Sequence, residues 1–599
     1  MWIKKVRRGC VMPKPIRPLD QAKILGLIEV SRRKRPATTW LRHGQIINVY
    51  TGEVERADVI LYEDRIAYVG EKAPLTDSNT VEIDASSYVL APGYIEPHAH
   101  PFQLYNVQAF SEFALSLGTT TLISDNLIFY LNMGREEYDY LFDYCSSLPI
   151  KNFWWTRLDP QSTQPEMLAK FTEGNLLKWL EHDRVLQAGE LTSWPNLLAG
   201  DESMLNGIVM TRNLGKRIEG HNPGASVDTL NAMAALGVTA CHEAINAQEV
   251  MRRLRLGMYA TLRHSSIRPD LPEIFSGLKE IGFDFNSAAA SRLMVTTDGS
   301  MPPFHRSGCV DYLIQLALES GVPALTAYRM ATLNPAVYYG LDQEIGGIAP
   351  GRIADIVFLE NVHQPKPLSV MADGRMVAEK GKLTEQWPLC DWDRMNFNPM
   401  KKSWRLQRES LDLNLDTTEI PVLEMVNAAI IKRSDVILPE TGLNTKDLEG
   451  YCYVSLIDQF GNWITNGIIK GFADRLDALA TTYTASQDVL VVGQCKDSMV
   501  EAVNDLLSRG GGIVLKEGNQ DLFHLDLPLS GKMSLLDMHD LMAETSNLVD
   551  MLKVRGHRHI DPLYTLFFLS ATHLPDLRLT AQGLYSIKEG RPLYPARRL

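Results

Sequence analysis

Short runs of β-branched and aromatic residues alternate with longer amphipathic stretches through the middle of the chain. The stretches between the runs, such as SVDTLNAMAALG and AQEVMRRLRLG, have helical periodicity and end in glycine. The runs that predict strands are residues 93–98, 120–124, 152–158, 184–190, 217–221, 238–242, 258–263 and 292–298. Eight β/α units in roughly 250 residues predict a closed parallel (β/α)8 barrel of the TIM type, with a doubly wound α/β sheet as the alternative.

Antiparallel β patterns flank this middle part on both sides. Before it, IINVYTGEVERADVILYEDRIAYVG and TVEIDASSYVL are short apolar runs separated by turns. After it, ADIVFLEN and LSVMADGRMVAEKGKL repeat the pattern. Two such segments on either side of a long insertion can complete one small unit. We therefore expect a β-sandwich from residues 37–91 and 343–395, and a barrel from residues 92–342.

The last third of the chain has strands and helices of its own. YCYVSLIDQFGNWITNGIIKGF, DVLVVGQ and GGGIVLKEG are typical of strands, whereas DSMVEAVNDLLSRG and SLLDMHDLMAETSNLVDMLKVRG have helical periodicity. A connector containing Trp and Pro separates this part from the preceding β segment. We expect a separate C-terminal α/β or α+β domain at residues 396–599, since 599 residues are too many for one core.

Charge and cysteine content narrow the class of protein. The net charge of −12 argues against nucleic acid as a partner. Residues 1–36 are the exception, with eleven Lys and Arg against two acidic residues, and we interpret them as a solvated, partly ordered extension. No apolar run is long enough to span a membrane. Seven scattered cysteines without a CxxC pair predict neither a disulfide framework nor a zinc knuckle, and favour a cytoplasmic location.

Potential metal ligands fall at the ends of the predicted strands. Two alternating histidines end the first strand in YIEPHAH, so their side chains share one face. In a parallel barrel the carboxyl ends of all strands face one mouth, where active sites are built. Glutamate, histidine and aspartate end four further strands. Six side chains are therefore expected to converge: His98, His100, Glu190, His221, His242 and Asp298.

The chemistry of this set predicts a hydrolase. Imidazole and carboxylate donors without thiolate suit Mn²⁺, Fe²⁺ or Zn²⁺. One cation can use the first two histidines and Asp298, and a second can use the other two histidines, with Glu190 bridging. Such a pair of cations lowers the pKa of a shared water, and Asp298 can take its proton and pass it to a leaving group. We expect a binuclear site that hydrolyses a C–N bond.

The chain resembles the adenine deaminase family of the amidohydrolase superfamily, over nearly its whole length after the basic extension. The matching stretches are APGYIEPHAH, GTTTLISD, GHNPGAS, GVTACHE, VTTD, RMATLNPAVYYGL, GGIAPGRIADIVFL, LPLSGKMS and PLYTLFFLSATHLPDLRLTAQGL. The resemblance implies a barrel with a β-sandwich and an extra C-terminal domain. It also implies hydrolysis of adenine to hypoxanthine and ammonia by a manganese or iron enzyme that is often a homo-oligomer.

The resemblance also implies roles for individual residues. It makes the six converging side chains the metal and proton-transfer groups. It makes Glu243 the acid that follows the last metal histidine and hydrogen-bonds the purine ring. The partner is then a small molecule, a purine base or a similar heterocycle.

Four stretches depart from the pattern of the family. Residues 101–104 read Pro-Phe-Gln-Leu instead of Ile-Glu-Ser-Ser, and residues 125–128 read Asp-Asn-Leu-Ile instead of Asp-Pro-His-Glu. Gly299 stands where the family has a second aspartate, and residues 484–488 read Thr-Ala-Ser-Gln-Asp instead of His-Asp-Ser-His-Asn. None of these four changes affects the six metal ligands, whereas polar groups expected around a purine are changed.

Two other functions stay open. One is an amidohydrolase that acts on another cyclic amide or amidine, in which Glu190 again bridges the cations. The other is a non-catalytic binding protein on the same scaffold, which predicts missing ligands, although none is missing. A zinc base deaminase of the HxE…PCxxC type is excluded, because that spacing is absent.

Overall fold

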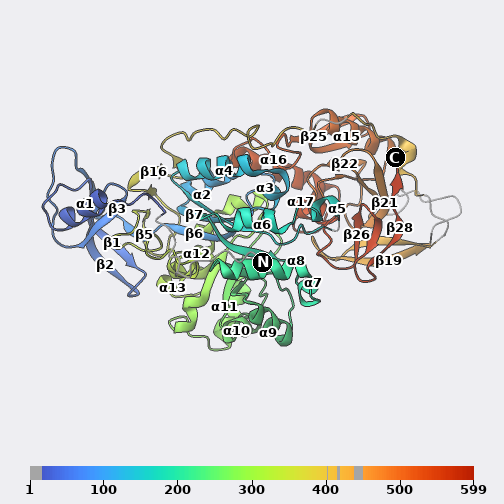
Figure 1. Cartoon of the computed structure of the whole chain (residues 1–599). Coiled ribbons are helices and arrows are strands. Elements are labelled where there is room, and N and C mark those ends of the chain that lie inside the picture. Colours follow the sequence, from blue (N-terminus) through green and yellow to red (C-terminus); the bar gives the residue numbers. More distant parts are fainter. Residues whose placement is uncertain (1–15, 163, 401–402, 414–418, 438–448) are drawn as a thin grey trace.

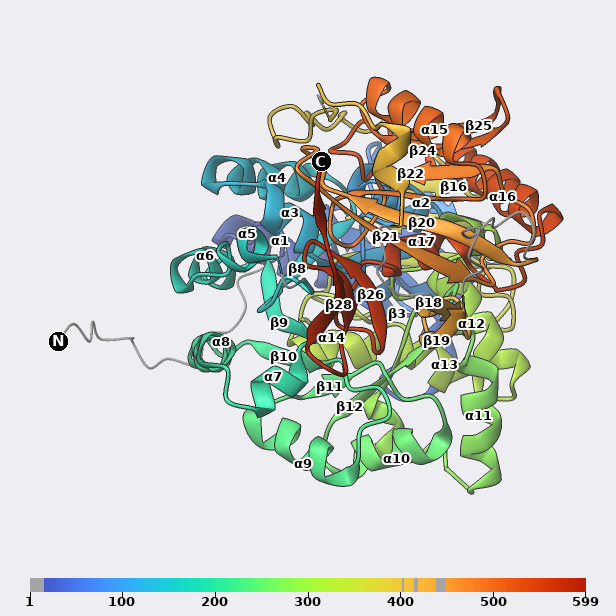
Figure 2. The same ribbon diagram turned by 90° about the vertical axis from the view of Figure 1, so that its right-hand side faces the viewer.

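Three parts of the molecule lie in a row (Figure 1). The computed structural model describes residues 16–162, 164–400, 403–413, 419–437 and 449–599. A β-sheet with the first strands of the chain lies at one end, the barrel is in the middle, and the C-terminal sheets lie at the other end. Figure 2, viewed from the C-terminal side, shows these C-terminal sheets in front of the barrel.

The two segments that flank the barrel in sequence build one nine-stranded sheet. Antiparallel pairing of β5 with β14 joins them. The strands are β1 Thr39–Asn48, β2 Glu53–Tyr62, β3 Arg65–Gly70, β4 Val81–Asp84, β5 Val89–Pro92, β14 Ile356–Leu359, β15 Ser369–Ala372, β16 Arg375–Glu379 and β17 Lys382–Leu383. Apolar side chains from both segments, among them Leu41 and Phe358, pack in one cluster. The two segments therefore meet as expected, and strand pairing makes them one continuous sheet.

Eight parallel strands form the barrel, each paired with the next along the chain. They are β6 Tyr94–Ala99, β7 Thr119–Asp125, β8 Lys151–Thr156, β9 Val185–Leu191, β10 Arg217–Gly220, β11 Ala240–Cys241, β12 Tyr259–Arg263 and β13 Leu293–Thr296. All eight coincide with predicted runs, so the barrel prediction is confirmed. A doubly wound sheet would reverse its strand order at a switch point, and this order does not reverse.

Side chains join the first and the last strand of the barrel. No backbone ladder connects β13 to β6 within the described residues. Instead, the buried carboxylate of Glu96 on β6 accepts hydrogen bonds from Thr296 Oγ1 at 2.6 Å and from the Thr297 backbone N–H at 2.9 Å. A buried carboxylate that is fully hydrogen-bonded can thus close the ring where the ladder is missing.

Helices follow the barrel strands and begin and end where the sequence indicates. The helix after β10 has Ser226 as its N-cap, whose side chain accepts from the Thr229 N–H, and Gly237 as its C-cap, with φ of 106°. The helices are α2 Val107–Ser116, α3 Leu127–Asn132, α4 Arg135–Ser147, α5 Pro165–Leu168, α6 Glu173–Leu180, α7 Trp194–Leu198, α8 Glu202–Asn213, α9 Val227–Leu236, α10 Ala247–Arg255, α11 Leu271–Glu280, α12 Val310–Glu319, α13 Ala324–Met330 and α14 Leu333–Tyr339, with 3₁₀ turns at Ala288–Arg292 and Pro302–Ser307.

The C-terminal part contains a nine-stranded sheet and a three-stranded sheet. The first has β18 Glu419–Met425, β19 Ile431–Ile437, β20 Tyr451–Ile457, β21 Trp463–Lys470, β22 Ala478–Thr481, β23 Val489–Gly493, β24 Gly512–Glu517, β25 Gln520–Asp526 and β29 Arg597–Arg598; the second has β26 Leu577–Thr580, β27 Gly583–Ser586 and β28 Arg591–Pro595. The helices are α15 Lys496–Ser508, α16 Met538–Val554 and α17 Pro562–Phe568, with a 3₁₀ turn at Arg408–Leu411. This part docks on the barrel, where the Ser534 N–H donates to the Leu104 carbonyl at 2.7 Å.

The basic N-terminal segment lies partly outside the described residues. From residue 16 onward it is docked rather than solvated, since Arg17 pairs with Asp373 at 2.7 Å and α1 Gln21–Ser31 packs on β3. Across the described chain, no helix has both the length and the apolar character needed to cross a membrane. The six cysteines in the described ranges are free thiols, and Cys10 lies outside them.

Candidate metal centre at the barrel mouth

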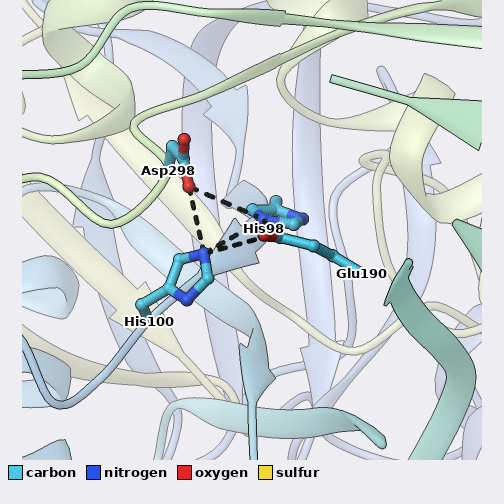
Figure 3. Close-up of side chains that lie close together, drawn as sticks. All are labelled: His98, His100, Glu190 and Asp298. Atoms are coloured by element: carbon cyan, nitrogen blue, oxygen red, sulfur yellow. Dashed lines mark hydrogen bonds and ion pairs between the residues drawn. The ribbon is translucent and has the colours of Figure 1, made fainter. Parts of the chain in front are cut away.

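All six predicted ligands lie together at the carboxyl ends of the barrel strands. His98 belongs to β6 and His100 follows it, Glu190 belongs to β9, and Asp298 follows β13. Figure 3 shows these four side chains pointing toward one another. The remaining two ligands follow β10 and β11 and join the same cluster through Glu190. Strands that are far apart in sequence thus deliver their terminal side chains to one point, as parallel barrel geometry requires.

The first group consists of His98, His100, Glu190 and Asp298. His98 Nε2 lies 3.1 Å from His100 Nε2 and 3.0 Å from Glu190 Oε2. Asp298 Oδ1 lies 3.0 Å from His100 Nε2 and 3.6 Å from His98 Nε2. Donor atoms about 2.1 Å from one cation lie about 3.0 Å apart in octahedral and about 3.4 Å apart in tetrahedral geometry. The spacing of these four donors therefore fits one divalent cation.

The second group consists of Glu190, His221 and His242. His221 Nδ1 lies 3.2 Å from Glu190 Oε1 and 3.1 Å from His242 Nε2, and His242 Nε2 lies 3.6 Å from Glu190 Oε2. These distances again match neighbouring donors around one cation. Glu190 contributes to both groups, so its carboxylate has the position of a bridge.

A buried glutamate orients two of the histidines. Glu219 Oε2 lies 2.9 Å from His98 Nδ1, and Glu219 Oε1 lies 3.1 Å from His242 Nδ1. Burial alone would raise the pKa of Glu219, but the two imidazoles outweigh it and lower this pKa to about 2. The ionised carboxylate fixes the proton of each ring on Nδ1, which leaves each Nε2 free to bind a cation. Asp125 does the same for His100, with Oδ2 at 2.8 Å from Nδ1.

Two buried arginines hold the carboxylates of the site. Arg157 Nε donates to Asp125 Oδ1 at 3.0 Å. Arg263 Nη1 lies 2.7 Å from Asp298 Oδ2 and 2.6 Å from Glu243 Oε1. Burial would raise the pKa of Asp298, but Arg263 and His100 outweigh it and hold this pKa well below its usual range. Asp298 is therefore ionised.

Glu243 lies beside the second group. Its Oε1 is 3.5 Å from both His221 Nδ1 and His242 Nε2, and its Oε2 accepts from Arg268 Nη1 at 2.8 Å. Burial would raise the pKa of Glu243, but Arg263, His221 and Arg268 lower it to about 2. The group is thus an ionised acceptor next to the cluster.

Two of the sequence departures lie next to the first group. A Cβ on Gly299 would come within 2.6 Å of the Tyr564 hydroxyl and 2.7 Å of Gln103 Nε2. Gln103 Nε2 donates to that hydroxyl at 3.2 Å, and Tyr483 donates to Gln103 Oε1. Tyrosines from the C-terminal part and Gln103 thus fill the space beside Gly299, so a larger residue there would have to displace the ends of these side chains.

The structure brings together every predicted site residue, while their binding of metal stays a prediction. Sequence reasoning missed the residues that orient the ligands: Asp125, Arg157, Glu219, Arg263 and Arg268. A signal for four of these was available, because Asp125 follows a predicted strand, Arg157 and Arg263 lie at or next to the ends of two others, and Glu219 lies two positions before His221.

Two family models match this chain. The model described as "Amidohydrolase family" matches residues 89–377, and the model described as "Adenine deaminase C-terminal domain" matches residues 431–591. Among solved structures, N-acetyl-D-glucosamine-6-phosphate deacetylase from Mycobacterium smegmatis aligns with a TM-score of 0.42 and 18% identity, over 57% of this chain and 99% of its own.

Two relatives match almost from end to end. A Halalkalibacterium halodurans protein named "Putative adenine deaminase BH0637" is 40% identical over 95% of this chain and 97% of its own length. A Moorella thermoacetica protein named "Adenine deaminase" is 30% identical over 93% of this chain and 95% of its own length. The match extends over both the barrel and the C-terminal sheets. This chain therefore belongs to the adenine deaminase family of amidohydrolases.

Proposed function

We propose that this protein is an adenine deaminase, which converts adenine and water to hypoxanthine and ammonia. The observation that carries the proposal is the convergence of four imidazoles and two carboxylates at the barrel mouth, in a chain of this family. A C–N hydrolase of the amidohydrolase family uses a divalent cation, and the donor spacings described above fit one.

The proposed metal centre is binuclear. His98, His100 and Asp298 would hold one cation, His221 and His242 the other, and Glu190 would bridge them. Mn²⁺ is the cation we propose, and Fe²⁺ or Zn²⁺ are the alternatives that suit the same donors. When bound, such cations lower the pKa of water to near neutrality and so supply hydroxide.

Asp298 has the position to move the proton of the reaction. Its Oδ1 faces the first group, while Arg263 holds its Oδ2 at 2.7 Å. In the proposed reaction the water oxygen forms a bond to C6 of adenine, and Asp298 accepts the water proton. Asp298 then gives that proton to the amino group, and the C–N bond breaks to release ammonia.

Glu243 has the position to bind the base. Arg263 and Arg268 keep its carboxylate ionised and fixed beside the second group. An ionised carboxylate only accepts hydrogen bonds, so Glu243 would accept an N–H of the purine ring.

Ammonia release by manganese-loaded protein tests the proposal. The substrates are adenine, other purines, pyrimidines and cyclic ureas at equal concentration, and we expect adenine to be the best of them. Ammonia from a cyclic urea or a pyrimidine but not from adenine would contradict the proposed substrate. No ammonia from any of them, in protein that holds its metal, would contradict catalysis and favour a binding protein.

Variants test the roles of single residues. Asp298→Asn cannot accept the proton, so we expect turnover to fall by at least about a hundredfold. Glu190→Ala removes the shared donor and His242→Ala removes a donor of the second cation, so metal analysis should find fewer than two ions per chain. Retained turnover in the first variant, or unchanged metal content in the other two, would rule out the assigned role. The homo-oligomeric state and the cytoplasmic location stay predictions.

A further inference from the structure

One histidine of the C-terminal part lies against the metal centre without being a ligand. His573 is in the connection between α17 and β26, and its ring centroid is 6.3 Å from that of His221, with the two planes at 89°. A residue more than 350 positions from His221 in sequence thus stands at the same site.

The connection that carries His573 is fixed on both sides. Thr572 Oγ1 donates to the Gln161 carbonyl at 3.4 Å, which ties it to the barrel. Arg578 Nε donates to the Ala571 carbonyl at 3.2 Å, and the ring of Phe568 meets the His573 ring at 82° with centroids 6.0 Å apart. The imidazole is therefore held in place before any substrate arrives.

One ring nitrogen of His573 makes no hydrogen bond in the part of the chain that the structure describes. This atom is Nδ1, and it is buried. Buried polar atoms are nearly always hydrogen-bonded, because leaving one unpaired costs free energy, so an exception at an active site points to a ligand.

The accessible side of the metal centre is the side on which His573 lies. The side chains of His98 and His242 are 0% exposed, whereas those of His221 and Asp298 are 17% and 12% exposed. A substrate therefore reaches the cluster from the side of His221 and Asp298. His573 is itself half-buried and packs against His221, the more exposed of the two.

We propose that His573 is a substrate-binding residue, which hydrogen-bonds the purine base while the base lies at the metal centre. The proposal rests on the proposed deaminase function and adds that the C-terminal part completes the active site. An imidazole offers one N–H donor and one nitrogen acceptor, and a purine edge offers both kinds of partner. The flat ring of the base can also pack on the imidazole.

Calorimetric titration of metal-loaded protein with hypoxanthine, the product of the proposed reaction, tests this inference. We expect His573→Ala to weaken hypoxanthine binding and to raise KM for adenine, each about tenfold, with a smaller change in kcat. His573→Asn keeps a hydrogen-bonding atom near the position of Nδ1, so it should recover most of the affinity. His524→Ala, on the exposed edge strand β25, is the matched control and should behave as the wild type.

Metal content and thermal unfolding are measured on the same samples. Weakened binding with a full metal complement, recovered in the asparagine variant, supports the proposal. Unchanged binding in His573→Ala, or equal losses in the alanine and asparagine variants, would overturn it. A loss that follows metal content or unfolding would show a structural role and would also overturn it. Wild-type protein that binds no purine would instead overturn the proposed function itself.

Discussion

Replacing Glu219 by glutamine should remove the second cation before the first. The carboxylate binds His98 Nδ1 through Oε2 and His242 Nδ1 through Oε1, and Gln187 Nε2 donates to Oε2 at 2.8 Å. In the variant, Gln187 Nε2 keeps donating to the amide oxygen, which therefore takes the position of Oε2. The new NH₂ group then faces His242. His242 then has no acceptor for its Nδ1 proton, and its ring shifts toward the tautomer whose Nε2 carries the proton and cannot bind metal.

The size of the effect follows from one lost hydrogen bond to a charged group. Such a bond contributes about 1.5–3 kcal/mol, which corresponds to about 10- to 100-fold in affinity and agrees with the range for partners that orient metal ligands. We expect a chelator titration of Glu219→Gln to show one tight ion and one weakened by that factor.

The control for Glu219→Gln makes the same change away from the metal centre. Glu344→Gln alters a carboxylate that pairs with the buried Arg65 at 2.7 Å, and it should leave both ions in place. Two ions bound to Glu219→Gln at wild-type affinity would refute the reasoning about ring orientation.

Three further predictions concern stability. Gly299→Ala places a Cβ 2.6 Å from the Tyr564 hydroxyl, so urea unfolding should show a loss of about 1–3 kcal/mol, and a wild-type midpoint would contradict the contact. Burial raises the pKa of Glu96 from 4.5 to about 7, so the folded chain keeps a proton that the unfolded chain has lost. Stability should therefore fall by about 3 kcal/mol as the pH rises through this window, and this fall should be absent in Glu96→Gln. Removing the metal with a chelator should lower the melting temperature of the wild type. Adding magnesium back, which nitrogen donors bind poorly, is the control and should not restore it.

The predictable part of the site is the part that regular strand geometry determines. A parallel barrel brings its strand ends to one mouth whatever the loops do, so residues such as Glu190 and Asp298 could be placed together from sequence spacing alone. The contacts of His573 and Tyr564 depend instead on how the C-terminal part docks on the barrel. Docking is decided by many weak contacts between distant segments, such as that of Ser534 with Leu104, and strand periodicity contains no information on it.

The residue two positions before a strand-end ligand was within reach of the sequence. Alternate residues of a strand point to one face, so the side chain at this position also points into the barrel, one layer below the metal. Glu219 precedes His221 by two, and Glu96 precedes His98 by two. The first orients two imidazoles, and the second closes the ring of strands against Thr296 and Thr297.

Each of the eight barrel strands ends in, or is followed by, at least one ionisable residue of the site, and their charges sum to an excess of negative charge when the histidines are neutral. Five buried carboxylates meet three arginines there: Asp125, Glu190, Glu219, Glu243 and Asp298 against Arg157, Arg263 and Arg268. The four imidazoles add no charge when they are neutral, which is the state that binds metal. Buried charge is tolerated only when it is compensated, so this excess of negative charge favours divalent cations at the centre of the cluster. Neutral imidazole nitrogens can bind a cation, and the surplus buried carboxylates need a compensating positive charge. Both features therefore favour cations at the point where the donor atoms converge.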